Sequence, residues 1–281
     1  MRIRRTIGRP EKLTYSAGFI LLAISSYFAL SWWQHHSVHF QLLSIVVEHE
    51  GNPDDTTIPN FHQLQVGWGK IWEVDAGDGT RWITQDLWAT FSRHLIGLTG
   101  GVLLSIVVGM AMGCFARVEA ALRPILSFLA KIPPTAMLAV FFVLVGTDEN
   151  LYYSMIMFGV FPTLAQSIFQ SSKYDVPLND IHMGYIQGCS TPEVIWNVVF
   201  KEILPRILEA VRLCIGPAMV FLIAAEWMMS DVGFGYRLRI QSRLLNMNVV
   251  YIYLCILGLT CYLMDTLVSL LRRKMCPWFQ D

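Results

Sequence analysis

Long apolar runs recur along the chain, and each is about as long as a helix that crosses a bilayer. Such a helix needs roughly 20 mostly apolar residues. We predict six membrane-spanning helices, over residues 16–33, 95–116, 125–146, 151–169, 211–229 and 249–271. The third run is interrupted near its start by Lys131 and Pro133-Pro134. Because helices satisfy their own backbone hydrogen bonds inside lipid, the pattern predicts an all-α polytopic membrane protein.

Length and flanking residues exclude two other interpretations of these runs. The strands of a membrane barrel would appear as alternating segments of about 10 residues. The first run follows five basic residues, as the core of a secretory leader does. However, it carries no charge over 18 residues and ends in Trp32-Trp33 rather than at a small-residue cleavage site. We therefore expect a retained first helix with an aromatic anchor at the membrane interface.

Composition supports a membrane protein and excludes several other classes. Hydrophobic residues make up 54% of the 281 residues and charged residues only 15%, whereas soluble domains carry about 25% charge. The apolar content excludes a disordered chain. The 21 basic and 21 acidic residues cancel, so the basic excess of a nucleic-acid-binding protein is missing.

The distribution of Lys and Arg predicts the orientation in the membrane. With the N-terminus inside, the inner segments hold 14 of these residues and the outer segments hold 6. Cytoplasmic loops carry such an excess of basic residues. We therefore expect a multi-pass protein of the inner (plasma) membrane with both termini in the cytoplasm.

The chain divides into three parts in this interpretation. Residues 1–33 form the cytoplasmic N-terminus and the first helix, residues 34–90 an external loop, and residues 91–278 a core of five helices. The external loop has eight acidic residues against two basic ones, a net charge of −6, and five of the seven histidines. We favour a solvated loop that meets another protein. A divalent metal site is the weaker alternative, with His35, His36 and His39 as its candidate ligands.

The second long loop, over residues 170–210, lies on the cytoplasmic side and contains a helix start. Ser190 can cap a helix, and Glu193 follows three residues later, as in a capping box. Pro192 is tolerated in the first turn. Val194 and Val198 then begin a helical repeat of apolar residues. The pattern predicts a short amphipathic helix that either lies on lipid or docks a cytoplasmic partner.

Three stretches of sequence resemble one family. They are Arg123-Pro124 through Lys131-Ile132-Pro133-Pro134 to Gly146, the loop that ends in Leu204-Pro205, and Ala225-Glu226 with Gly233-Phe234-Gly235-Tyr236, Asp265 and the closing basic run to Trp278. Together they resemble the permease subunit of bacterial ABC importers of the nitrate/sulfonate/taurine/bicarbonate group. The resemblance covers about residues 87–278 and implies an ABC type I importer-like fold with a cytoplasmic coupling helix.

The resemblance also implies a docking site for an ATPase in the cytoplasmic loop. The residues that it places there are His182, Gly184, Gly188, Cys189, Ser190, Thr191, Glu193 and Pro205. The family's loop normally reads Glu-Ala-Ala, three residues, then Gly. Gly188 matches that glycine and Pro205 matches the final proline. His182-Met183-Gly184 replaces Glu-Ala-Ala, and Lys201 stands where the family has an earlier proline.

The resemblance further implies that this chain works with partners. It has no G-x-x-x-x-G-K-[ST] phosphate loop, so we expect no catalytic residues, no cofactor in this chain, and ATP and Mg²⁺ bound by a separate ATPase dimer. A second permease copy, identical or related, and an external solute-binding protein complete the expected importer. Two access states of the helix bundle would alternate to carry a small solute inward, an anion such as nitrate, a sulfonate, taurine or bicarbonate.

Charged residues near the spans are candidates for the pathway or its gate, because such groups are costly in lipid. They are Glu226, Arg237, Arg239, Arg243 and Asp265. We expect Glu226 to pair with Arg237 or Arg239 and stiffen an external gate. The three arginines suit an anion at the outer mouth, but we favour docking to acidic lobes of a binding protein or local pairing with Asp231. For Asp265 we favour a buried partner for a hydroxyl or backbone group over contact with substrate.

Two other classes of function compete with the importer. A polytopic membrane enzyme would place a cluster of His, Asp and Glu at one membrane face, and the chain has no Ser/His/Asp or H-E-x-x-H arrangement. A channel or secondary transporter would show solute flux without an ATPase, and it usually has an internal repeat, which this sequence lacks.

Overall fold

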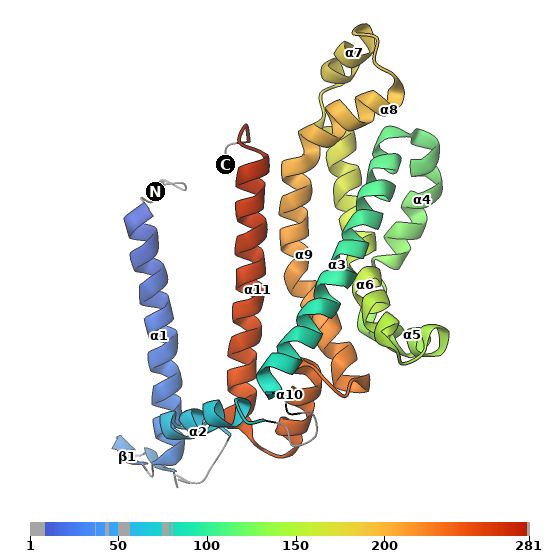
Figure 1. Cartoon of the computed structure of the whole chain (residues 1–281). Helices are drawn as coiled ribbons and strands as arrows, with labels where there is room; N and C mark the ends of the chain where they lie inside the picture. Colours follow the sequence, from blue (N-terminus) through green and yellow to red (C-terminus); the bar gives the residue numbers. More distant parts are fainter. Residues whose placement is uncertain are drawn as a thin grey trace. The chain divides into compact units, whose positions relative to one another are not determined.

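The computed structural model describes residues 9–36, 38–42, 45–49, 57–74, 79 and 81–279, and it is dominated by long helices (Figure 1). Five helices are long and apolar enough to cross a membrane: α1 (Arg9–His35), α3 (Trp82–Cys114), α6 (Glu149–Gln170), α9 (Phe200–Met229) and α11 (Met247–Met275). They contain the first, fourth, fifth and sixth predicted spans and all but the last two residues of the second. The all-α fold class is therefore confirmed, apart from a small hairpin of β1 (Val38–Leu42) and β2 (Ile45–His49).

The third predicted span is not one straight helix. It contains part of α4 (Ala116–Leu129), then the short η1 (Pro134–Met137) and α5 (Leu138–Val145), and the chain bends by 87° between the two halves. Pro133 and Pro134 lie at the break, where they remove backbone donors and prevent a continuous helix. The pair forms a sixth span only if the bent halves are counted together.

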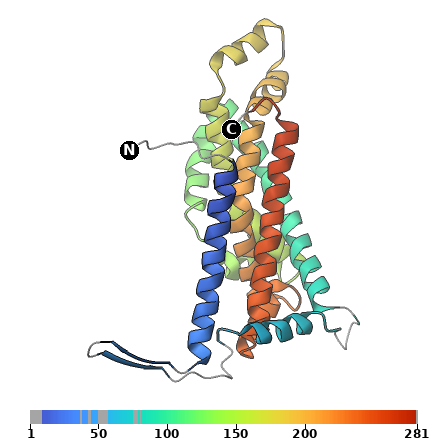
Figure 2. The ribbon, with the colours of Figure 1, turned by 90° about the vertical axis from the view of Figure 1, so that its left-hand side faces the viewer.

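The chain divides into two compact units. The first comprises residues 1–73 and 241–252 and contains α1, the hairpin, α2 (Phe61–Ile71) and the start of α11. Within it, the Ser31 hydroxyl lies 3.0 Å from Asn60 Oδ1, and the Tyr27 hydroxyl donates to the Pro59 carbonyl at 3.1 Å. The α2 helix lies across the direction of α1 (Figure 2). These contacts hold the start of α2 against α1.

The second unit, residues 74–240 and 253–281, is a bundle built on α3, α6 and α9. Small residues at four-residue spacing on α3 let α6 approach closely, as in many packed membrane helices. A side chain at Gly97 would meet Ile156 at 2.8 Å, and one at Gly109 would meet the Ala165 carbonyl at 2.7 Å. The Ser105 hydroxyl, on the same stripe, lies 3.2 Å from the Phe161 carbonyl.

Each end of this bundle carries shorter elements. At one end are α7 (Leu178–Ile186) and α8 (Thr191–Val194), which we call the α7 end, and α10 (Phe234–Arg243) begins at the other, the α10 end (Figure 1). Two wider π-helical turns, η2 (Ser171–Asp175) and η3 (Ile195–Val199), join α6 to α7 and α8 to α9. The two ends carry the two groups of candidate residues.

Candidate functional site

The α7–α8 element is a folded turn rather than a free loop. Gly188 follows α7 with φ +85°, a left-handed conformation that L side chains rarely adopt. Glu193 then accepts hydrogen bonds from the Ser190 backbone N–H at 2.7 Å and from its hydroxyl at 2.8 Å. The predicted capping box is therefore confirmed, and it begins α8.

Gly184 lets α7 pack against the helix that follows. A side chain there would meet Val194 Cγ2 at 3.2 Å and Val198 Cγ2 at 3.6 Å. The opposite side of α7 is open to solvent, with Met183 57% and Ile186 80% exposed. The predicted docking residues His182, Ser190, Thr191 and Glu193 are exposed too, and Cys189 is partly exposed. An exposed apolar surface of this kind is typical of a protein–protein contact.

The helix predicted after Ser190 is not a separate short helix. The α8 helix, the π turn η3 and α9 follow one another without a break from Thr191 to Met229. Pro205, which the resemblance assigns to the docking loop, is buried inside α9. The α7–α8 turn is therefore joined to a membrane-spanning helix with no loop between them.

A second group, which we call the polar cluster, lies at the α10 end and is centred on the fully buried Asp86 of α3. Its carboxylate accepts hydrogen bonds from the Gly233 N–H at 3.0 Å, from Arg237 Nε at 2.8 Å and from the Tyr253 hydroxyl at 2.8 Å. Burial works against the charge of Arg237, but Asp86 outweighs it and raises the pKa of Arg237. One carboxylate thus connects α3, α10 and α11.

The other half of the polar cluster is centred on Glu226 of α9, which is also fully buried. It accepts hydrogen bonds from the Thr90 hydroxyl at 2.9 Å, the Gly235 N–H at 2.9 Å and Arg93 Nη1 at 3.1 Å. Arg93 also forms a two-pronged pair with Glu149 at the start of α6, at 2.7 and 2.5 Å. These bonds connect α3, α6, α9 and the start of α10.

The polar cluster joins the ends of several helices. The start of α10 lies against Glu226, because a side chain at Gly233 would meet its carboxylate at 2.6 Å. Every charged member has an opposite charge beside it: Arg93 has Glu226 and Glu149, and Arg237 has Asp86. Removing either partner of a buried ion pair is strongly destabilising, so these bonds stabilise one arrangement of the helix ends.

The predicted partners of Glu226 were wrong. Glu226 pairs with Arg93, while Arg237 pairs with Asp86. Arg239 instead donates to the carbonyls of Trp227 at 2.9 Å and Met228 at 3.1 Å, in the last turn of α9. Arg243, at the end of α10, is exposed. The arginines of α10 therefore do not form one group in this conformation.

Asp265 has a charged partner rather than the expected hydroxyl or backbone group. Arg212 Nε of α9 donates to Asp265 Oδ1 of α11 at 2.6 Å. A second pair, Arg272 with Glu209 at 2.9 Å, lies further along the same two helices. Asp265 and Arg212 are each about one-third exposed, so this pair joins α9 to α11 at the edge of the bundle.

Sequence reasoning missed Asp86, Thr90 and Arg93 as site residues because they precede the second predicted span. The α3 helix begins at Trp82, so the last nine residues of the predicted external loop, 82–90, already belong to it. The signal was present: Ile83, Asp86, Thr90, Arg93 and Gly97 recur at three- and four-residue spacing, which places them on one helix face.

Two of the three histidine candidates for a metal site, His35 and His36, lie near backbone carbonyls of α1. His35 Nδ1 lies 2.7 Å from the Ser31 carbonyl oxygen, and His36 Nδ1 lies 3.1 Å from that of Trp32. His39 lies in β1, and its side chain is outside the described part of the chain. Within the described residues, no group of three His, Cys, Asp or Glu side chains could hold a metal ion.

Comparison with known proteins identifies the family. Residues 101–276 match the family described as binding-protein-dependent transport system inner membrane component. The matched region includes α4, α6, the α7–α8 element, α9 and the whole of α11. Glu226 and Glu149 of the polar cluster also fall in it, whereas Asp86, Thr90 and Arg93 precede it.

Several similar proteins are transport permeases. The chain is 29% identical over 201 residues to the taurine transport system permease protein TauC of Escherichia coli (strain K12), which covers 72% of each chain. It is 28% identical to the putative aliphatic sulfonates transport permease protein SsuC of Bacillus subtilis (strain 168), covering 66% of this chain and 67% of that one. It is 21% identical to the nitrate import permease protein NrtB of Synechocystis sp., over 72% and 74%.

A solved structure supports the fold. A chain of the MetNI methionine ABC transporter, in an inward-facing conformation, superimposes with a TM-score of 0.57 at 17% identity. The match covers 69% of this chain and 94% of that chain. This likeness confirms the expected type I importer fold. The chain therefore belongs to the binding-protein-dependent transport system inner membrane components and is the transmembrane permease subunit of an ABC importer.

Proposed function

We propose that this permease carries a small oxoanion into the cell, driven by a separate ATPase that docks on the α7–α8 element. The observation that carries the proposal is the exposed apolar side of α7 beside α8, and α8 continues through η3 into α9. A docked ATPase can therefore act on a membrane-spanning helix without an intervening loop. The expected partners are an ATPase dimer that binds ATP and Mg²⁺, a second permease copy and an external binding protein.

The proposed substrate class is supported by the relatives. Their names give taurine, aliphatic sulfonates and nitrate as the substrates of three similar permeases, and bicarbonate as that of a fourth. All four substrates carry oxygen-rich acidic groups that a guanidinium binds well. We propose the same class for this chain.

Orientation follows from the same proposal. The ATPase works in the cytoplasm, so the α7 end faces inward and the polar cluster at the α10 end faces outward. Lys and Arg counts support this direction, because the segments at the α7 end are the ones rich in basic residues. The polar cluster would then close the outer end of the permease while the α7 end is accessible.

Alternating access links the two ends of the bundle. Rigid helices that move as a body around a central path are typical of transporters. ATP binding closes the ATPase dimer, the α7–α8 turns move together, and α9 carries that motion to Glu226 at the far end. We expect the bonds of Glu226 to α3 and α10 to break and reform in each cycle. A membrane enzyme or an ATP-independent channel is not favoured, because the family consists of importer permeases.

Reconstitution tests the proposal. The permease is purified in mild detergent with the ATPase and binding protein that co-purify with it, and the complex is placed in vesicles. We expect uptake of taurine or nitrate that requires the binding protein and ATP on the ATPase side. Uptake without ATP would indicate a channel or secondary transporter. A bound amino acid or cation in the purified binding protein would contradict the anion class.

A further inference from the structure

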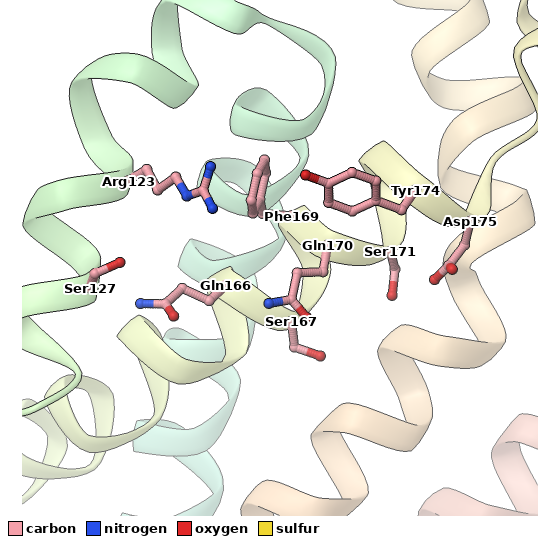
Figure 3. Close-up of a pocket in the computed structure, with 9 residues that line it drawn as sticks. All are labelled: Arg123, Ser127, Gln166, Ser167, Phe169, Gln170, Ser171, Tyr174 and Asp175. Atoms are coloured by element: carbon pink, nitrogen blue, oxygen red, sulfur yellow. The ribbon is translucent and has the colours of Figure 1, made fainter.

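We infer that a polar cavity between α4 and α6 binds the transported oxoanion on its way out of the permease. The cavity has a volume of about 520 Å³, within the range of small-ligand pockets, which is roughly 300–1,000 Å³. Arg123 and Ser127 of α4 form one side, and Gln166, Tyr174 and Asp175 of α6 and η2 form the other (Figure 3). This inference rests on the proposed function, because it names a site for that substrate.

The charges around the cavity leave one positive group in excess. Lys173 Nζ contacts both oxygens of Glu119, at 2.6 and 2.8 Å, and so neutralises that carboxylate. Arg123 reaches the same carboxylate only through a longer contact of 3.3 Å. Asp175, the acid on the cavity wall, pairs with Arg206. Three cations therefore face two acids, and Arg123 is the cation that a bound anion would neutralise.

Hydrogen-bond donors in the cavity also fit an anion. The side-chain nitrogen of Gln166 is buried and has no hydrogen-bond partner among the described residues. Figure 3 shows this nitrogen pointing toward the side of the cavity where Arg123 and Ser127 lie. A buried donor without an acceptor is costly, and an oxoanion would supply the acceptor. The Ser127 and Tyr174 hydroxyls line the same space and can donate as well.

The position of the cavity assigns it to the exit side. Its residues lie in the last turns of α6 and in η2, immediately before α7. With the α7 end facing the cytoplasm, an anion released from the central path would reach the cavity last. Because η2 forms part of the cavity wall and leads into α7, movement of the α7–α8 element would change the shape of the site.

Charge-selective labelling of a cysteine in the cavity tests this site directly. Ser127→Cys is introduced into the permease of the assembled complex, and its reaction with a sulfonate-bearing methanethiosulfonate is compared with that of a trimethylammonium analogue. The six native cysteines also react, so labelling is measured on the peptide that contains residue 127. We expect the anionic reagent to react about tenfold faster, relative to a small-molecule thiol, because of the nearby guanidinium.

Two further variants sharpen the measurement. Adding Arg123→Gln should remove the anion preference, while adding Arg117→Gln, a matched change in the first turn of α4, should keep it. Millimolar ethanesulfonate should slow the reaction of Cys at position 127 with the anionic reagent when Arg117→Gln is present. It should not slow that reaction when Arg123→Gln is present. A preference that is absent at the start, or that survives Arg123→Gln, would overturn the site. If vesicles import none of the tested anions while the labelling preference is present, the proposed function fails instead.

A separate observation concerns α2 in the first unit, and we infer that this helix lies in the headgroup layer of the bilayer. Phe61, Trp68 and Trp72 recur at seven- and four-residue spacing on one face and are 61%, 51% and 41% exposed. The two tryptophan rings pack edge to face with centroids 6.0 Å apart. Exposed tryptophans of this kind are enriched where a membrane meets water.

The contacts of α2 place it at the boundary of the membrane. Asn60, just before α2, bonds to Ser31 near the end of the apolar α1, and Gly67 lies against the Asn248 backbone at the start of α11. The end of one membrane-spanning helix and the start of another therefore lie at the level of α2. Lipid headgroups are the partner available to an aromatic face at that level.

Spin-label depth measurements test the position of α2. A nitroxide is attached to Trp68→Cys or, as a control on the opposite face, to Val66→Cys, in the complex in vesicles, and the signal of the labelled wild-type chain is subtracted. We expect the label at residue 68 to be more accessible to oxygen than to a water-soluble nickel chelate, and the label at 66 to show the reverse. Equal nickel access at both positions would overturn the inference. Shielding of residue 68 only after the binding protein is added would do the same.

Discussion

The turn between α7 and α8 depends on one residue, Gly188. Its φ of +85° lies in the left-handed region, yet a side chain there would meet no atom within 4 Å. The position therefore requires glycine for its backbone conformation and not for space. Asparagine adopts this conformation more readily than other L residues, whereas β-branched residues do so rarely.

This difference predicts a graded effect on coupling. Gly188→Val should strain the turn by about 1–2 kcal/mol and displace the docking surface, whereas Gly188→Asn should be tolerated. We expect the number of anions imported per ATP hydrolysed to fall several-fold for valine and to change little for asparagine. Equal ratios for both variants, measured in vesicles with the assembled complex, would show that the turn does not transmit the coupling.

The pair of Glu226 with Arg93 gives a second prediction at this scale. Glu226→Gln removes one charge from a fully buried pair, which costs about 3 kcal/mol. For a chain of this size, the loss corresponds to a fall in Tm of roughly 6–12 °C. Glu202→Gln, an exposed acid in the first turn of the same helix, should change stability by less than about 0.5 kcal/mol. Thermal unfolding in detergent measures both, and similar shifts would contradict a buried role for Glu226.

At the scale of helices, apolar periodicity predicted the spans well and their ends poorly. The spans over residues 151–169 and 249–271 fall inside α6 and α11, because a run of apolar residues is dictated by the bilayer. The α3 helix begins 13 residues before its predicted start, at Trp82, because Asp86 and Arg93 looked external. Those charges are compatible with a buried helix face only because Arg237 and Glu226, far along the chain, neutralise them. No local pattern reports such partners.

The same dependence on distant partners explains which residues of the candidate site could be predicted from the sequence. Ser190 and Glu193 were predictable because a capping box is a local structure, whereas Gly188 came from the resemblance to the family's loop. The partners of Glu226 and Asp265 were not, since Arg93 and Arg212 lie 133 and 53 residues away. Several arginines were equally plausible from charge alone, and only the packing of the helices selects among them.

The attachment of α10 gives a prediction for a whole element. Asp86 is the acceptor for three donors, two of them from α10 or the residue before it. Asp86→Asn leaves Arg237 without its counter-charge. It also places the N–H groups of the asparagine amide against the donors that the carboxylate had accepted from. We expect the amides of residues 233–240 to exchange with deuterium faster, while Asp231→Asn, an exposed acid in the preceding loop, leaves them unchanged. Equal exchange in the two variants would mean that α10 is held by other contacts.

For the whole molecule, the proposed orientation predicts the side of each segment. A green fluorescent protein fused after residue 281 should fluoresce, because both termini are expected in the cytoplasm. Alkaline phosphatase fused after residue 60, just before α2, should be active, because that region is expected outside. The reverse result would invert the chain and move the α7 end away from any cytoplasmic ATPase. This test is independent of the substrate.

The π turn η3 has a consequence for how the sequences of such permeases can diverge. A π turn holds one more residue than an α turn, so losing one residue between 195 and 199 would restore a regular helix without breaking the chain. Because the π turn already holds its extra residue within a single turn, the α7 side would keep nearly the same direction relative to α9. A deletion in the regular part of α9 would instead rotate the α7 side, with Met183 and Ile186, by about 100°. Related permeases can therefore gain or lose a residue in η3 while they keep the same docking surface, and elsewhere in α9 they cannot.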